Sequence, residues 1–459
     1  MGSVSALRIV GTCLLVATLA SSCSARGESG KRLTASSKAT GSKILHAFGG
    51  PGSPAQDGAE PKGTLTAVTV DGKVVLFGRT AIGGIDDCGI IFSINPDGSD
   101  YDVRYRFRGR DGCDPRHDAM VLNPGDGKLY GATLGVNQSD NKSYGSRGHI
   151  HAFKPDAPIS FPIPAVKTFA GEPGAAEQHS SFSIDPVSGL MYGQSAFGGK
   201  DNTGLLYAVS ADGATFVPLH DFKKSTGSHP HGRIVLHDGV LYGVTRTDGE
   251  LPDSRRKGHG AVFSYPVASP LTKGPFTILH VFAGAPDDGA LSDHGYLLPV
   301  VVGGKTIFFG LTQCGGTGKG KDACPMSDGG GSGTIYQIDP TAPPGSRRVI
   351  NIVYSFQGRE RVDGAEPYGS LMYDGTYLYG TTSAGGAYGK GTVFRIRPVA
   401  FGAKATPTLL RHFGANANDG AKPIDNVIKV GDTLYGLTVF GGAGAGLGSG
   451  TVFAIPVPN

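Results

Sequence analysis

Four histidines occupy one shared position in the sequence, just before a short apolar run that recurs along the chain. They are His117, His179, His231 and His294, and the same position in three other segments holds Lys62, Tyr368 and Ile424. Imidazole transfers protons near neutral pH and is a common metal ligand. The pattern therefore predicts a site for an anionic ligand or for proton transfer, and two or three of the four histidines could instead bind a divalent metal.

A second set of polar side chains follows the next apolar run of these segments and consists of Arg79, Gln194, Arg246 and Gln313. A long segment after Arg246 adds Arg255, Arg256, Lys257 and His259. Cations and imidazoles together suit an acidic ligand through charge and hydrogen bonding. We therefore predict that such a ligand contacts Lys62, Arg79, Gln194, Gln313, His117 and His294.

The same residues are suited to β-elimination on a uronic-acid polymer. This reaction needs a base beside the acidic carbon, a cation for the developing enolate and an acid for the leaving oxygen. His179 or His231 could be the base, Arg246 with Gln194 the enolate stabiliser, and Tyr368 the acid. In the alternative interpretation, the histidines bond to backbone carbonyls and only fill a channel.

Several functional classes lose support from the motifs that the sequence lacks. It contains no Gly-x-Ser-x-Gly elbow, no His-Glu-x-x-His pattern and no Walker loop. Its net charge is only +4, and no basic run is interleaved with aromatic residues as in a nucleic-acid groove. We therefore expect no nucleic-acid partner, and no cofactor beyond a divalent metal is indicated.

A repeat indicates the elements that must position these residues. An aromatic residue followed by glycine recurs at the same place in each of seven units, at Phe77, Tyr130, Tyr192, Tyr242, Phe309, Tyr379 and Tyr435. Each copy precedes a glycine-rich segment and a Gly-x-apolar-aromatic run, in which only His151 replaces the aromatic residue. Alternating apolar residues before and after these runs indicate four short strands in each unit.

Seven units of four short strands predict an all-β fold, a seven-bladed β-propeller with four-stranded blades. The seventh unit ends after its third strand, whereas residues 43–48 match the fourth-strand pattern and precede the first unit. We therefore expect residues 43–48 to complete the C-terminal blade and to close a ring that spans residues 43–459. The loops that carry the polar residues should then emerge on one face, around the channel.

The two C-terminal units carry the clearest form of the repeat. Residues 363–394 and 419–453 each contain Asp-Gly-Ala-x-Pro, then Leu-Tyr-Gly, then Gly-Thr-Val-Phe. This pattern resembles the GloVer tandem-repeat family of bacterial extracellular, choice-of-anchor proteins. The resemblance implies a secreted or surface-anchored repeat protein and assigns no chemistry.

The N-terminus has the layout of an export signal. Arg8 precedes an apolar stretch over residues 9–20 that is too short to span a bilayer, and small residues follow it. We predict a signal peptide over residues 1–22 and a flexible tether over residues 23–42. Cys23 follows a sequence close to a lipoprotein box. Either it is lipidated, and the protein is held in the periplasm or at the outer surface, or the chain is freely secreted.

The rest of the chain contains four more cysteines, Cys88, Cys113, Cys314 and Cys324. An exported chain reaches a compartment that permits disulfides. We expect Cys88 to pair with Cys113, and Cys314 with Cys324, because each pair lies within one loop or in two neighbouring loops.

Three functions fit these patterns. The first is a non-catalytic module that binds an acidic polysaccharide or cell-surface glycan, with Phe197, Tyr388 and Phe440 as stacking platforms in a chain without tryptophan. The second is a polysaccharide lyase, and the third is a structural surface protein without a ligand. We expect a monomer that meets a membrane only through a lipid anchor.

Overall fold

The computed structural model describes most of the chain from Gly41 onward. The described residues are 41–49, 57–117, 119–134, 136–137, 142–143, 148–169, 181–251, 257–267, 271, 274–319, 323–325, 328–346, 348–358, 362–442 and 448–457. The predicted signal peptide, Cys23 and nearly all of the predicted tether lie outside this part of the chain and stay predictions. Within it, no helix is long and apolar enough to cross a membrane.

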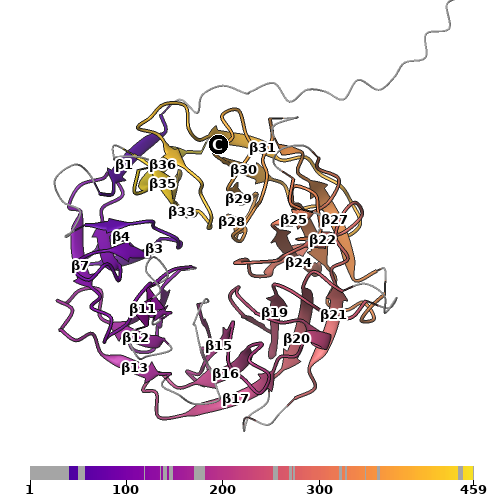
Figure 1. Ribbon diagram of the computed structural model, residues 1–459, viewed down its shortest axis with the longest axis horizontal. Helices are drawn as coiled ribbons and strands as arrows, with labels where there is room; N and C mark the ends of the chain where they lie inside the picture. The colour runs from indigo at the N-terminus through magenta and orange to yellow at the C-terminus, as the bar shows by residue number, and fades with distance from the viewer. Residues whose placement is uncertain are drawn as a thin grey trace, which may run out of the picture. The chain divides into compact units, whose positions relative to one another are not determined.

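Seven four-stranded antiparallel sheets are arranged as a ring around a central axis (Figure 1). Blade 1 contains β3 (Thr66–Val70), β4 (Lys73–Thr80), β6 (Ile90–Ile94) and β7 (Asp102–Arg106). Blade 2 contains β8 (Val121–Leu122), β9 (Leu129–Thr133), β12 (His149–Phe153) and β13 (Ala165–Thr168). Blade 3 contains β14 (Ser183–Ile184), β15 (Met191–Ser195), β16 (Leu205–Val209) and β17 (Phe216–Asp221).

The remaining blades repeat this order. Blade 4 contains β18 (Val235–His237), β19 (Val240–Thr245), β20 (Ala261–Pro266) and β21 (Thr277–Val281). Blade 5 contains β23 (Leu298–Val302), β24 (Lys305–Thr312), β26 (Thr334–Ile338) and β27 (Ile350–Ser355). Blade 6 contains β28 (Met372–Tyr373), β29 (Leu378–Thr382), β30 (Thr392–Ile396) and β31 (Thr408–His412). The fold is the predicted seven-bladed β-propeller.

Blade 7 joins the two ends of the described chain. It contains β33 (Ile428–Val430), β34 (Thr433–Thr438), β36 (Thr451–Pro456) and, as its outer strand, β1 (Lys43–Ala47). β1 pairs antiparallel with β36, with Ile44 opposite Phe453 and Ala47 opposite Thr451. The predicted closure by residues 43–48 is therefore confirmed, and it removes a sheet edge that an open ring would expose.

Shorter elements lie in the loops before the first strand of a blade and in the loops between its second and third strands. The two-stranded pairs are β2 (Gly58–Ala59) with β5 (Ile82–Gly83), β10 (Val136–Asn137) with β11 (Lys142–Ser143), β22 (Gly289–Ala290) with β25 (Cys314–Gly315), and β32 (Gly420–Ala421) with β35 (Phe440–Gly441). A single 3-10 turn, η1, spans Lys224–Thr226. Three of the four pairs join the Gly-Ala of the repeat motif to the loop that follows the second strand of the same unit.

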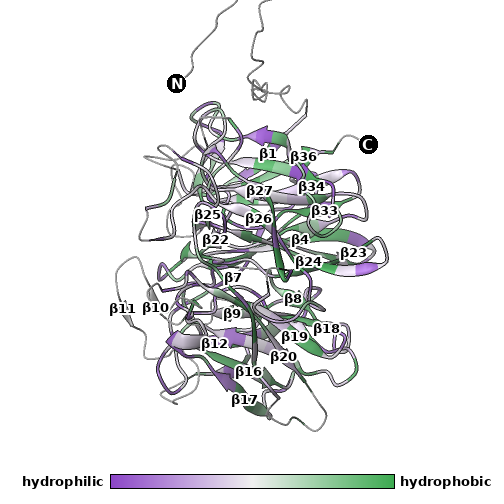
Figure 2. Ribbon diagram, turned by 90° about the vertical axis from the view of Figure 1, so that its right-hand side faces the viewer, coloured by the Kyte–Doolittle hydropathy of each residue, from purple (hydrophilic) through white to green (hydrophobic). Residues whose placement is uncertain are grey.

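The aromatic-glycine step is explained by close packing inside each blade. A Cβ atom on Gly78 would lie 2.3 Å from the Phe92 ring, and one on Gly380 would lie 2.6 Å from the Phe394 ring. Larger residues therefore cannot replace these glycines without moving the ring. Neighbouring blades pack together through apolar side chains, as in the cluster of Phe48, Phe92 and Val452. Strands such as β20 are rich in hydrophobic residues (Figure 2). This packing fixes the blades and so positions the loops above them.

Candidate functional site

A cavity of about 740 Å³ lies at the mouth of the channel. Its walls come from the loops that precede the first strand of a blade and the loops between the second and third strands. The lining residues are Lys62, Arg116, His117, Phe197, His229, His231, Arg246, Thr247, Asp293, His294, Tyr368, Lys422, Ile424, Val439 and Phe440. Both kinds of loop therefore open on one face, as the strand order predicts.

Three of the four predicted histidines come together in this cavity. The rings of His117 and His294 stack 3.7 Å apart with 7° between their planes, although their loops precede blades 2 and 5. The His231 ring lies 5.3 Å from that of His294. The centroid of the Tyr368 ring lies 5.7 Å from that of the His294 ring. His179, the fourth histidine, lies outside the described residues.

Asp293 connects this aromatic row to a cation. Its Oδ1 atom accepts a hydrogen bond from Nδ1 of His231 at 2.8 Å and lies 3.0 Å from Nε of Arg246. Its Oδ2 atom lies 3.6 Å from Nε2 of His294. Because Asp293 is almost fully buried, these partners replace the water that would otherwise stabilise its charge.

The electrostatics give these groups defined protonation states near neutral pH. Burial by itself raises the pKa of the Asp293 carboxyl, but His294, His231 and Arg246 outweigh it and hold that pKa well below its ordinary value. Asp293 is therefore an anion and accepts the hydrogen of its bond with Nδ1 of His231. Burial and the charge of Asp293 raise the pKa of Tyr368 to about 12, so its phenol keeps its proton.

Sequence reasoning missed Asp293 and Arg116, although both have a signal in the repeat. In most units a buried apolar residue stands directly before the first strand of the blade and follows the motif glycine by seven positions, as Leu371 follows Gly364. In units two and five it follows by eight, as Leu297 follows Gly289. The one-residue insertion places an extra side chain before the histidine, and both Arg116 and Asp293 line the cavity.

The predicted polar residues after the second strand separate into two groups. Arg246 and Gln313 come three positions after the repeat glycine, beyond the ends of β19 and β24. Arg246 lines the cavity, and Gln313 forms a hydrogen bond with Tyr368. Arg79 and Gln194 come directly after the glycine, inside β4 and β15, where both are buried. The structure therefore does not place these two on the cavity wall.

Arg79 and Gln194 instead hold the backbone of the mouth loops. The Arg79 guanidinium donates hydrogen bonds to the carbonyls of Ala132 at 2.8 Å and His117 at 3.0 Å, both in the next unit. The Gln194 amide donates to the carbonyl of Gly232, directly after His231. These two buried side chains therefore fix the backbone that positions the cavity residues His117 and His231.

A second group of cations lines the cavity on the side of blades 1, 2 and 7. Nζ of Lys62 lies 2.5 Å from the Glu60 carboxylate. Arg116 forms an ion pair and hydrogen bonds with Asp114. Lys422 lines the same cavity. Burial and the nearby charge of Arg116 lower the pKa of Lys62, which shows that these cations are close enough to repel one another.

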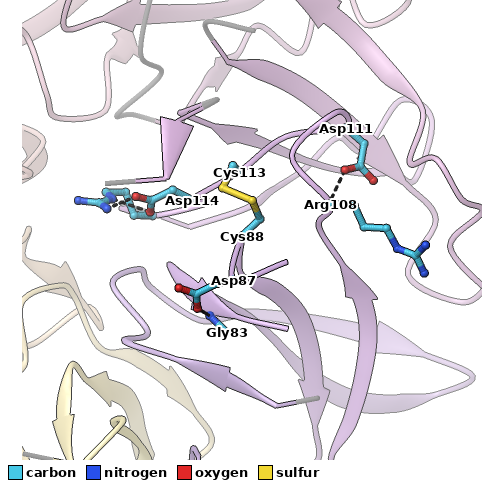
Figure 3. The surroundings of a disulfide bond; sticks show 8 residues. Gly83, Asp87, Cys88, Arg108, Asp111, Cys113 and Asp114 are labelled. Atoms are coloured by element: carbon cyan, nitrogen blue, oxygen red, sulfur yellow. Dashed lines mark hydrogen bonds and ion pairs between the residues drawn. A yellow bond between two sulfur atoms is a disulfide. The ribbon is translucent and has the colours of Figure 1, made fainter. Parts of the chain in front are cut away.

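Both predicted disulfides are present and lie beside the mouth loops. Cys88 is bonded to Cys113, and Cys314 to Cys324. Figure 3 shows the first bond between the loop of Asp87 and the segment that leads to Asp114. Cys113 replaces the alanine of the repeat motif, so this bond fixes the segment that carries Arg116 and His117.

Among the described residues, the side chains that could hold a metal are His231, Asp293 and His294, whose ligand atoms lie within 4.8 Å of one another. Two imidazoles and a carboxylate are a donor set that zinc accepts. Arg246 lies 3.0 Å from the same carboxylate, however, and its positive charge opposes a dication there. The donor types fit a metal, whereas the neighbouring charge favours the hydrogen-bonded form.

The other predicted residues lie in several places. Phe197 and Phe440 line the cavity, whereas Tyr388 is an exposed residue elsewhere. Lys257 is exposed, and His259 is bridged to Asp248 through the backbone. Arg255 and Arg256 lie outside the described residues. The cavity lining therefore contains six of the ten predicted catalytic or ligand-binding residues, namely Lys62, His117, His231, Arg246, His294 and Tyr368.

Comparisons with known proteins give one family match. No curated protein sequence matches the chain. Among solved structures, the chain is similar to polysaccharide lyase Uly1, with 12% identity and a TM-score of 0.45 over 91% of this chain and 100% of that chain. It is similar to Trypanosoma rangeli sialidase in complex with sialic acid, with 13% identity and a TM-score of 0.43 over 87% of this chain and 72% of that chain.

A third similar structure is TolB from Acinetobacter baumannii, with 11% identity and a TM-score of 0.39 over 75% of this chain and 65% of that chain. At such identities these likenesses carry no functional argument. The family model of the Gloeobacter/Verrucomicrobia repeat matches residues 323–459, which include both units with the clearest motif. This match confirms the resemblance of the C-terminal units to that repeat family.

Proposed function

We propose that the protein binds an acidic polysaccharide in the cavity at the channel mouth. The observation that carries this proposal is the charge of the cavity wall. Among the described lining residues, four are lysine or arginine and four are histidine, whereas Asp293 is the one carboxylate. Glu60 and Asp114, which pair with Lys62 and Arg116, are not part of this lining. The wall therefore attracts anions.

Two aromatic rings favour a sugar as the carrier of the negative charge. Phe197 and Phe440 both line the cavity and are partly exposed. A sugar ring has apolar faces that pack on aromatic side chains, while its carboxylate needs cationic or hydrogen-bonding partners. The combination suits a uronic acid better than a small inorganic anion. The two disulfides fit an oxidising compartment, where such polymers occur.

Binding is tested with polygalacturonate and alginate as acidic probes and amylose as the neutral probe. Affinity electrophoresis and calorimetry of the full chain should detect binding of an acidic polymer that weakens with added salt, and no binding of amylose. Arg246→Gln should weaken binding at least tenfold. Lys305→Gln removes an exposed charge at the opposite end of blade 5 and should leave binding unchanged. Equal binding of amylose, or full affinity of Arg246→Gln, would contradict the proposal.

The His231–Asp293 hydrogen bond favours a second candidate, cleavage of the bound polymer by β-elimination. The bond orients the imidazole and leaves Nε2 as a base that can take the proton from the carbon beside the carboxylate. The electron pair of that C–H bond forms a carbon–carbon double bond, and the glycosidic oxygen leaves. Arg246 would stabilise the enolate, and the protonated Tyr368 would donate the proton to the leaving oxygen.

Cleavage is distinguished from binding by its product. The new double bond is conjugated with the carboxylate and absorbs in the ultraviolet, so incubation of the protein with the polymer should raise absorbance as the chains shorten. Tyr368→Phe should keep binding and lose this signal, because it removes only the hydroxyl. A polymer that binds and stays intact would leave the protein a binding module.

A further inference from the structure

We propose that the cavity contains two separate anion subsites, so that the ligand is a chain with acid groups on at least two of its sugars. The first subsite consists of Lys62, Arg116 and Lys422. The second subsite consists of Arg246, His231 and His294. This inference rests on the proposed binding function and narrows its ligand from an acidic sugar to a polyanionic chain.

The first subsite brings three like charges into one wall of the cavity. Its residues come from the loops that precede blades 1, 2 and 7. Lys62 pairs with Glu60 and Arg116 with Asp114, which leaves the charge of Lys422 in excess over these two carboxylates. Burial lowers the pKa of Lys62, and repulsion from the charges of Arg116 and Lys422 lowers it further. An acid group of the ligand would relieve this repulsion.

The backbone does not require lysine at position 422. Lys422 has a φ of 59°, and the equivalent position of the Asp-Gly-Ala-x-Pro motif also has positive φ in Glu60 and Glu366. The conformation is therefore a property of the repeat, whereas the residue type varies. Hydrogen bonds from Lys422 N to Lys390 O and from Val439 N to Lys422 O hold this loop. The lysine charge is thus placed in the cavity by a rigid turn that would accept other residues.

The second subsite is built on the opposite arc of the ring. Its residues come from blades 4 and 5 and surround the carboxylate of Asp293. His117 follows Arg116 of the first subsite directly, and its ring stacks on that of His294 in the second subsite, so the stacked pair joins the two subsites. A ligand that reaches both subsites must therefore pass over these rings.

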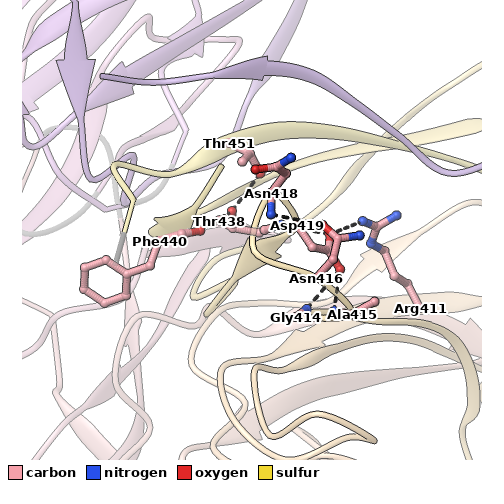
Figure 4. Close-up of polar contacts among 10 residues, drawn as sticks. Arg411, Gly414, Ala415, Asn416, Asn418, Asp419, Thr438, Phe440 and Thr451 are labelled. Carbon is pink, nitrogen blue, oxygen red and sulfur yellow. Dashed lines mark hydrogen bonds and ion pairs between the residues drawn. The ribbon is translucent and has the colours of Figure 1, made fainter. Parts of the chain in front are cut away.

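Each subsite also has its own aromatic ring. Phe440 lies in β35 and pairs with Ala421, the residue that precedes Lys422 in the chain. Figure 4 shows its ring directed away from the polar contacts around Asp419. Phe197 packs edge-on against His229, 4.9 Å away, beside the second subsite. A cation with a neighbouring aromatic ring suits one uronic acid residue, and the cavity offers this pair twice.

Chain length tests this arrangement. We would measure the affinity of the full chain for galacturonic acid and for oligogalacturonates of increasing length, with alginate oligomers as a second series. Two joined acid groups that reach both subsites make the second contact intramolecular, so affinity should rise at least about tenfold at the first length that spans them. Lys422→Asn should abolish this rise and leave binding of the single acid at the second subsite.

Two controls keep the result interpretable. Asparagine tolerates positive φ, so Lys422→Asn should keep the fold, which its melting temperature verifies. Lys305→Gln should keep the full dependence on chain length. If Lys422→Asn retains the rise while Arg246→Gln loses binding, the two-subsite proposal is wrong and the binding function stands. If the unmodified protein binds none of the acids, the proposed function fails as well.

Discussion

The Arg79 guanidinium in blade 1 donates a hydrogen bond to the carbonyl of His117, 3.0 Å away in the loop before blade 2. Arg79 is itself nearly fully buried, and it bonds to the carbonyl of Ala132 as well. A charged donor inside the ring thus fixes the backbone of a residue at the cavity. The same position directly after the repeat glycine holds Thr381 in blade 6, whose hydroxyl donates to the carbonyl of Asp425 before blade 7.

Replacing Arg79 tests whether this contact supports the cavity. Arg79→Met leaves two buried carbonyls without their donor and should lower the free energy of unfolding by about 1–3 kcal/mol for each. It should also weaken binding of the acidic polymer, because His117 loses its backbone anchor. Arg104→Met is the matched control, since Arg104 donates to the carbonyl of Ala157 at the rim of the same two blades. Loss of binding in Arg104→Met to the same degree would contradict a specific role for Arg79.

Removing the closing strand should open the ring. A chain that begins after Phe48 lacks β1 and exposes the edge of β36, together with the apolar surface that Phe48 covers. We expect aggregation in size-exclusion chromatography and loss of the cooperative thermal transition. A chain that begins at Lys43 keeps the strand and should behave as a monomer. A stable monomer without β1 would show that closure by this strand is dispensable.

The two disulfides should contribute unequally to stability. Cys88 and Cys113 are 25 residues apart, whereas Cys314 and Cys324 are 10 apart. The entropy lost by the unfolded chain on loop closure predicts losses of about 3.5 and 2.7 kcal/mol when each pair is replaced by serine. Chemical denaturation measures both values. Because the first bond fixes the segment before His117, only its removal should also weaken binding.

Protonation of His151 should make stability depend on pH. Burial and the charge of Arg79 hold the pKa of His151 well below 6.5, so the folded protein keeps this imidazole neutral. As the pH falls below 6.5, the unfolded chain takes up a proton that the folded protein does not, and stability decreases. His151→Gln should flatten this decrease between pH 6.5 and pH 5 by up to about 1.4 kcal/mol per pH unit.

The effect on pH dependence is measured by denaturation at several pH values. His149 lies nearby, and burial lowers its pKa too, so part of the decrease should remain in the variant. The comparison between the variant and the unmodified protein isolates the contribution of His151. Parallel curves for the two proteins would show that the pKa of His151 is the same in the folded and unfolded states, which would contradict the prediction.

The fold could be predicted from the sequence because the repeat is specified by local sterics. Each aromatic-glycine step marks a place where a ring occupies the space of a side chain, so seven steps count seven blades. The closing strand could be recognised because residues 43–48 keep the same alternation as other outer strands. The disulfides followed from the neighbouring positions of their loops.

The site could be predicted only in part, because small shifts in register decide which side chains reach the cavity. Arg79 and Arg246 both follow a repeat glycine, yet two further positions place Arg246 beyond its strand and leave Arg79 inside the ring. Asp293 was missed because it comes from a one-residue insertion. The contact between His117 and His294 depends on ring curvature, which no local pattern specifies.

The register of β1 decides on which face of the ring the described chain begins. Lys43 begins β1 opposite Ala454, near the end of β36 that leads away from the mouth loops, and Ala47 lies opposite Thr451, near the mouth. The chain that precedes Lys43 therefore joins the ring on the side turned away from the cavity. A label attached at the start of β1 would therefore lie on the face opposite the cavity and leave the mouth unobstructed.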